Sequence, residues 1–168
     1  MEEILKSIVG KISSYQLFNY IFTGYTFIFL LDILFQYNLL SYEVIFLFPI
    51  FYYVGLVISR IGSLIIEPLL QKLKFVIFVA YPDFLRASQQ DPKIEVLSCD
   101  NNMYRTFCAV FFALLCVKGY SYIANIFEIS ENATTLVFIL SQLILFLFSY
   151  RKQTAYVKKR VDALNSRE

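Results

Sequence analysis

The sequence of 168 residues contains no histidine. Histidine is the commonest metal ligand and the commonest general base at neutral pH, so its absence excludes a histidine-based hydrolase and an intramembrane metalloprotease. The three cysteines are an odd number without paired spacing, which favours ordinary buried or interfacial thiols over a disulfide or redox role. We therefore expect no enzymatic activity, no metal and no cofactor.

Charged residues are also scarce. They make up 17% of the chain, whereas 58% of the residues are hydrophobic and the mean hydropathy is +0.61. A soluble domain needs a largely polar surface, so this composition indicates that lipid is the main solvent of the folded chain.

Several apolar segments approach or exceed the roughly 20 residues that a helix needs to cross about 30 Å of hydrocarbon. The predicted spans are residues 16–35, 42–66, 104–127 and 134–150. The sequence thus predicts an all-α, multi-pass membrane protein in which residues 1–168 form one domain. The dipeptide Glu67-Pro68 is expected to interrupt the helix of the second span.

The distribution of lysine and arginine predicts the orientation. The short loops 36–41 and 128–133 contain neither residue, whereas 67–103 and 151–168 contain several. Because basic residues are retained on the cytoplasmic side, both termini and the central segment should lie in the cytoplasm, with the spans in the cell inner membrane.

The two cytoplasmic segments are expected to be helical. In residues 67–103, the apolar run 73–81 is too short to cross a bilayer, and Tyr81-Pro82 and Asp91-Pro92 are typical helix boundaries. We expect a helical hairpin there, and a polar C-terminal helix over 151–168 that continues the fourth span.

Two charged residues fall inside the predicted spans, Asp32 and Lys118. Each costs roughly 2.5–3.5 kcal/mol in hydrocarbon unless it finds water or a partner. They could pair and snorkel to the interface, or line a pore. Thr135 and Gln142, seven residues apart on the fourth span, could also line a pore or form hydrogen bonds between helices.

Small residues recur at helical spacing on two spans. Gly55, Ser59 and Ser63 recur every four residues on the second, and Ala109 and Ala113 share one face of the third. Small residues let helix backbones approach closely, so we expect these faces to be packing faces.

Basic, amide and aromatic residues gather along the predicted cytoplasmic rim. Such a mixture is suited to an anionic nucleotide or a single-stranded nucleic acid, although the positive-inside bias and anionic lipid headgroups also account for it. The candidate ligand-binding residues are Lys72, Lys74, Arg86, Lys93, Asn101, Asn102, Tyr104, Arg105, Arg151 and Lys152.

The overall plan, together with the stretch DPKIEVLSCDNNMYRT at residues 91–106, resembles small membrane effectors of bacterial antiviral defence of the Hailong type. The resemblance implies a homo-oligomeric ion channel, with a tetramer as the suggested assembly. It also implies that a cytoplasmic nucleic-acid signal opens the channel or holds it shut. No functional residue is carried over from that family.

Two functions follow from these features. The first is an oligomeric pore or ion channel that a cytoplasmic ligand or partner gates. The alternative is a membrane anchor or scaffold for a soluble regulatory protein, which would dock on the cytoplasmic hairpin and require no pore.

Overall fold

The computed structural model describes residues 2–37, 39–41 and 44–165, and every regular element in these ranges is helical. The elements are α1 (Glu2–Phe35), η1 (Leu39–Ser41), α2 (Val44–Ile61), η2 (Gly62–Ile66), α3 (Glu67–Lys72), α4 (Tyr81–Gln90), α5 (Lys93–Ile126) and α6 (Glu131–Asn165). The prediction of an all-α chain is confirmed.

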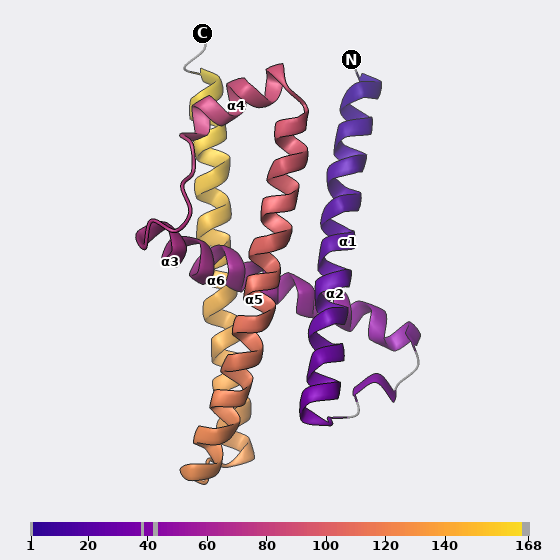
Figure 1. Cartoon of the computed structure of the whole chain (residues 1–168), viewed down its shortest axis with the longest axis vertical. Coiled ribbons are helices and arrows are strands. Elements are labelled where there is room, and N and C mark those ends of the chain that lie inside the picture. The colour runs from indigo at the N-terminus through magenta and orange to yellow at the C-terminus, as the bar shows by residue number, and fades with distance from the viewer. Residues whose placement is uncertain (1, 38, 42–43, 166–168) are drawn as a thin grey trace.

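Four helical stretches are long and apolar enough to cross a membrane, as predicted. They are Ser14–Phe35, Phe46–Lys72, Lys93–Ile126 and Glu131–Asn165. Helices α1, α5 and α6 extend lengthwise, and the two ends of the chain lie at the same end of the molecule (Figure 1). The α5–α6 turn and η1 lie at the opposite end.

The long helices extend beyond the predicted spans. Helix α1 starts at Glu2, and α5 and α6 contain 34 and 35 residues, or about 51 Å each at 1.5 Å per residue. Helix α4 begins at Tyr81 and ends before Asp91, and α5 follows Pro92, so both predicted boundaries are confirmed. The tail continues α6 as a helix, also as predicted.

The predicted interruption at Glu67-Pro68 is wrong, because the helix continues to Lys72. A proline ring normally clashes with the carbonyl four residues earlier, which here belongs to Leu64. Residues 62–66 form a π-helical turn, and the N–H of Glu67 donates to the carbonyl of Gly62, five residues back. This wider turn directly before Pro68 accommodates the ring, so α2, η2 and α3 form one continuous rod.

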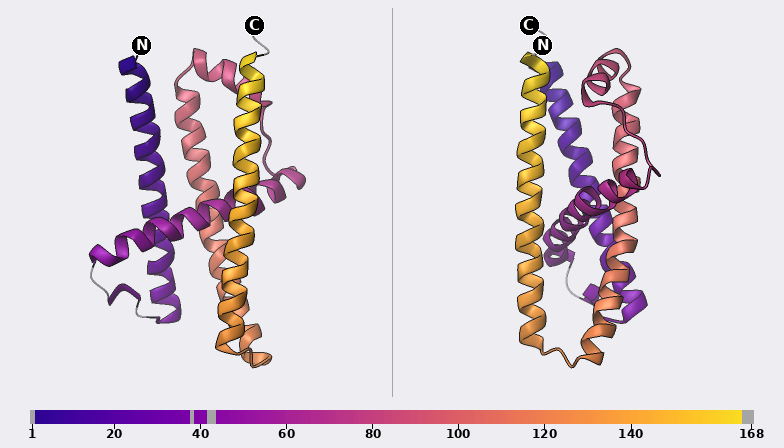
Figure 2. Two further views of the ribbon diagram at one scale, coloured as in Figure 1. Left: turned by 180° about the vertical axis from the view of Figure 1, so that it is seen from behind. Right: turned by 90° about the vertical axis from the view of Figure 1, so that its left-hand side faces the viewer.

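That rod crosses the other long helices obliquely (Figure 2). At its crossing with α1 the two backbones touch. A Cβ atom added to Gly24 would lie 1.8 Å from the carbonyl oxygen of Phe51, and one added to Gly55 would lie 1.7 Å from that of Tyr20. Glycine is therefore required on both helices, and the packing role predicted for Gly55 is confirmed.

Small residues also mediate the contact between the rod and α5. A Cβ atom on Gly62 would lie 3.3 Å from the carbonyl oxygen of Arg105, and Ala109 and Ala113 of α5 are buried. The main core cluster forms around this contact and consists of Leu31, Ile58, Ile66, Ala109, Val110 and Leu114.

Helix α6 stands apart from this core. Only 6% of its most apolar 18-residue window is buried, and its main contacts are with α2 rather than with α5, the helix to which it is joined. The right-hand view of Figure 2 shows α5 and α6 separated along most of their length. The core is thus formed by α1, α2 and α5, and α6 is held mainly by a few specific contacts.

We expect Gly55→Ala to destabilise the protein, because the added methyl group meets backbone rather than a movable side chain. Overpacking of this kind costs roughly 2 kcal/mol, which lowers the thermal midpoint by about 4–8 °C for a chain of this size. Thermal unfolding in detergent measures the change. The matched control is Gly119→Ala, where nothing lies within 4 Å of the added atom. Equal midpoints for the two variants would contradict the tight crossing.

Candidate functional site

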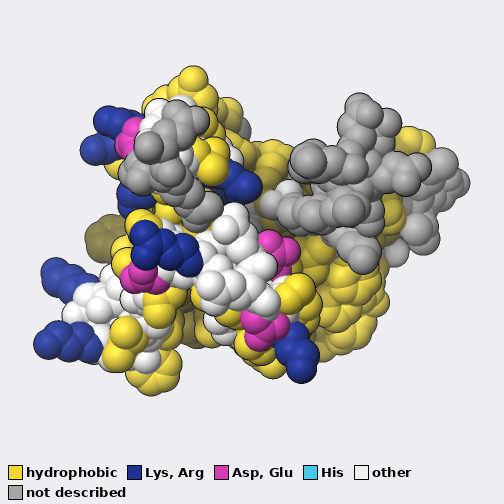
Figure 3. Space-filling view, turned by 90° about the horizontal axis from the view of Figure 1, so that it is seen from above, with side chains coloured by type: hydrophobic (Ala, Val, Ile, Leu, Met, Phe, Trp, Pro, Cys, Tyr) yellow, Lys and Arg dark blue, Asp and Glu magenta, His cyan; other side chains and the backbone are white. Residues whose placement is uncertain are grey.

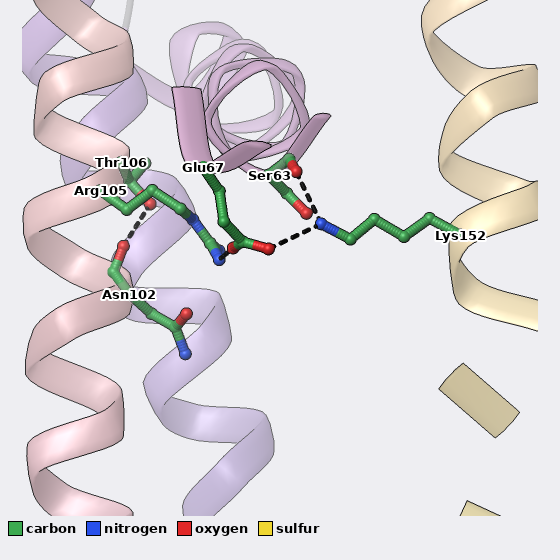
Figure 4. A network of polar contacts seen from close by, with 6 residues as sticks. All are labelled: Ser63, Glu67, Asn102, Arg105, Thr106 and Lys152. Carbon is green, nitrogen blue, oxygen red and sulfur yellow. Dashed lines mark hydrogen bonds and ion pairs between the residues drawn. The ribbon is translucent and has the colours of Figure 1, made fainter. Parts of the chain in front are cut away.

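A carboxylate and two basic residues from three different helices meet at the start of α3. The Glu67 carboxylate accepts hydrogen bonds from the Arg105 guanidinium of α5 and from Lys152 Nζ of α6, the latter at 3.0 Å (Figure 4). Lys152 Nζ also donates to the backbone carbonyl of Ser63 at 2.6 Å. We call Glu67, Arg105 and Lys152 the ion cluster.

The ion cluster is largely shielded from solvent. The side chains of Glu67, Arg105 and Lys152 are 12%, 22% and 24% exposed. Charges at such a depth require partners, because desolvation is expensive and an unpaired buried charge is strongly destabilising. The cluster carries one net positive charge, and it fixes α6 to a core that α6 otherwise contacts sparsely.

Local backbone geometry brings Glu67 to this position. The π turn of η2 adds a residue to one turn of the rod, which rotates the following residues relative to a regular helix. The carbonyl of Ser63, within that turn, becomes the second acceptor for Lys152. Pi turns of this type occur frequently at functional sites.

A polar cavity of about 440 Å³ lies beside the cluster, between residues of α1, α2, η2, α4, α5 and α6. Arg105 forms part of its wall, together with Asn19, Arg60, Cys99 and Asn102. Arg60 Nη2 donates to Tyr20 Oη at 3.2 Å. The cavity therefore contains two guanidinium groups and several amide and hydroxyl groups.

Two polar atoms at this cavity are buried and have no hydrogen-bond partner among the described residues. They are Oδ1 of Asn19 and Nε of Arg105. Most buried polar side-chain atoms in folded proteins are hydrogen-bonded, so an unpartnered pair in one cavity indicates that water or a ligand completes the site.

An apolar groove of about 890 Å³ lies on the other side of the cluster, between α1, α2, η2, α5 and α6. On the rod, Ser63 lines the polar cavity and the next residue, Leu64, lines the groove. On α6, Phe148 lines the groove and Tyr156 lines the cavity, with Lys152 midway between them. The ion cluster thus separates the polar cavity from the apolar groove.

The two charges predicted within the spans have separate partners. Asp32 Oδ1 accepts a hydrogen bond from the backbone N–H of Leu39 at 2.5 Å, and Lys118 Nζ lies 5.2 Å from the centre of the Phe35 ring. No ion pair joins them in the described part of the chain. Asp32 therefore stabilises the turn that follows α1, and Lys118 makes a cation–π contact at the same end of the molecule.

The two polar residues predicted to act together on α6, Thr135 and Gln142, have different surroundings. Gln142 Oε1 accepts a hydrogen bond from Tyr53 Oη of α2 at 3.3 Å, and Gln142 also lines the apolar groove. Thr135 is exposed on the helix surface. Of the two residues, Gln142 thus forms a hydrogen bond between α6 and α2.

The predicted cytoplasmic ligand residues do not form a single site. Asn102 and Arg105 line the polar cavity, and Arg105 and Lys152 belong to the ion cluster. The other predicted ligand residues are exposed and belong to neither feature. They are Lys72, Lys74, Arg86, Lys93, Asn101, Tyr104 and Arg151. In the described part of this end of the molecule, basic side chains lie in several separate places rather than in one patch (Figure 3).

Several residues of the site were not predicted from the sequence. Among them are Glu67, the centre of the cluster, for which only a helix interruption was predicted, and Asn19, for which no role was predicted. The sequence did contain a signal for Glu67. Arg60, Ser63 and Glu67 follow one another at spacings of three and four, so Glu67 extends the helical face that carries the small residues of the second span.

Comparison of the chain with protein-family models, with curated proteins and with solved structures finds no match. Among the described residues, no group of three Cys, Asp or Glu side chains is placed to hold a metal ion.

We expect Glu67→Gln to destabilise the protein by about 3 kcal/mol, because it leaves two partly buried cations without their carboxylate. Thermal unfolding in detergent measures the loss. Lys72→Gln, which changes an exposed residue of α3, should alter stability by less than about 0.5 kcal/mol.

A double-mutant cycle separates the ion pair from general packing. Adding Lys152→Met to Glu67→Gln should cost much less than Lys152→Met alone, because the partner of Lys152 is already gone. Strictly additive losses would show that Glu67 and Lys152 act independently.

Proposed function

We propose that the chain is one subunit of an oligomeric membrane pore or ion channel that is gated from the cytoplasmic side. The observation that carries this proposal is the order of three features along the molecule: a polar cavity with two arginines, the ion cluster, and an apolar groove at the depth of the spans. A polar mouth followed by an apolar groove, which neighbouring subunits would close into a passage, is the arrangement of a hydrophobic gate.

The ion cluster supplies a physical basis for gating. Hydrophobic constrictions stop ions by excluding water, so a modest separation of helices can wet and open them. Helix α6 is little buried and is held to the rod by Lys152 and by the Tyr53–Gln142 contact. A ligand or partner that competes for Lys152 would release α6 from η2 and α3.

The ligand and the assembly follow from the charge pattern and the family resemblance. An anionic nucleotide or a single-stranded nucleic acid would be attracted to the basic residues at the end where the chain termini lie. A homo-oligomer, in the resembling family suggested to be a tetramer, would surround the pore with several copies of the same helices. A role in antiviral defence rests on that resemblance alone.

Ion flux into liposomes tests the channel. Because Glu67 holds the proposed gate shut, Glu67→Gln should raise the basal flux several-fold over the unmodified protein, and Lys72→Gln should leave it unchanged. Asp32→Leu and Lys118→Leu should leave the closed state intact, since neither residue contacts the cluster. Silence of the unmodified protein and of Glu67→Gln, both verified as folded, would rule the channel out.

Reporter fusions test the orientation. Fusions after residue 90 and after the C-terminus should be active with a cytoplasmic reporter, because the lysines and arginines are concentrated there. Fusions after residues 37 and 129 should be active only with an exported reporter. An exported reporter that is active at residue 90 would reverse the assigned orientation.

One observation favours the alternative of a membrane anchor or scaffold. The segment between α3 and α4 begins with a turn, continues without regular structure and lies outside the predicted spans, and Phe75 and Ile77 in it are 79% and 92% exposed. Exposed apolar side chains of this kind mark protein or membrane contacts. Co-purification of a stoichiometric soluble protein that Ile77→Asp abolishes, together with an electrically silent protein, would favour the anchor.

A further inference from the structure

The polar cavity combines burial with unmet hydrogen-bonding capacity. Asn19 is 6% exposed, and its Oδ1 faces no donor among the described residues. The buried Nε of Arg105 likewise has no acceptor, although another nitrogen of the same guanidinium binds Glu67. One acceptor and one cationic donor in the same cavity therefore remain for a molecule that enters it.

The electrostatics of the cavity select the sign of that molecule. Arg60 lines the cavity, and its hydrogen bond is to the neutral hydroxyl of Tyr20; no ion pair involves it within the described residues. Glu95 is the one carboxylate in the described cavity wall. Glu95 and the nearby Asp100 are both exposed, whereas Arg60 and Arg105 are half-buried. The inner part of the cavity is therefore cationic.

The cavity is also large enough for more than isolated waters. Its volume of about 440 Å³ falls within the range of roughly 300–1,000 Å³ that is typical of small-molecule sites. The aromatic side chains of Phe84 and Tyr156 complete the wall. Guanidinium groups present several fixed donors and match oxyanions better than any other side chain does.

We propose that this cavity binds an oxyanion of the phosphate type, held by Arg60 and the free Nε of Arg105, with Asn19 accepting a hydrogen bond from the same ligand. Two sources carry this chemistry: a soluble phosphate compound that enters from the cytoplasm, and the headgroup of an anionic lipid. The binding itself is independent of conduction, whereas a gating role for it rests on the proposed channel.

Bound phosphate can be detected through Cys99, which lines the cavity, after the two exposed cysteines are changed by Cys108→Ser and Cys116→Ser. In detergent, millimolar inorganic phosphate should slow maleimide labelling of Cys99 at least about threefold relative to chloride of equal ionic strength. The same phosphate should raise the thermal midpoint, as any ligand of the folded state does.

Arg60→Gln should abolish both effects, because Arg60 supplies donors that no carboxylate occupies. Arg86→Gln is the matched control, since it removes an exposed arginine of α4 that is not part of the cavity wall. The unfolding midpoint of each variant without phosphate establishes that it is folded.

A second arm distinguishes the sources. In nanodiscs, protection of Cys99 by an anionic lipid relative to a zwitterionic one, without an effect of soluble phosphate, assigns the site to a headgroup. The proposal is overturned if neither source protects Cys99 or raises the unfolding midpoint, or if Arg86→Gln loses both effects as Arg60→Gln does. If phosphate protects Cys99 in a protein that never conducts ions, the phosphate site is supported and the proposed channel is contradicted.

Discussion

The structure depends on a single carboxylate at the level where the apolar core gives way to polar residues. Glu67 binds a cation from α5 and a cation from α6, and it belongs to the rod that crosses the other long helices. Hydrophobic association between helices is weak in lipid, because the solvent is as apolar as the side chains. Specific polar contacts therefore determine where the loosely packed α6 lies, and Glu67 makes the one described ion pair to it.

The helices themselves could be predicted from the sequence because bilayer thickness constrains their length. The apolar stretches placed the ends of α1 and α5 and the start of α6 within three residues, and prolines marked both ends of α4. Helix α1 begins at Glu2 rather than at residue 16, and α5 begins at Lys93 rather than at residue 104. The continuation past Pro68 could not be predicted, because it depends on a π turn that hydrophobic periodicity does not encode. Gly24 was missed for a related reason: its partner, Phe51, is far away in sequence.

The site was only partly predictable. Sequence reasoning selected Arg105, Lys152 and Asn102 by residue type and by their position near the ends of spans, and these residues do lie around the polar cavity or the ion cluster. It could not separate them from the exposed residues Lys74 and Arg151, since which basic residue meets a carboxylate is decided by tertiary packing. The cavity is likewise a product of several helices and has no local signature.

The close contact between α1 and α2 at Gly24 and Gly55 forms a fixed point about which the rod can tilt. Gly55 is 11 residues from Val44, the first residue of the rod, and 12 residues from Glu67. At 1.5 Å per residue the two arms measure about 16–18 Å. Because backbone touches backbone at the fulcrum, a tilt of about 5° there displaces Glu67 by roughly 1.5 Å, enough to part atoms hydrogen-bonded at ~3 Å. A push on the rod at Val44 would thus be transmitted to the ion cluster.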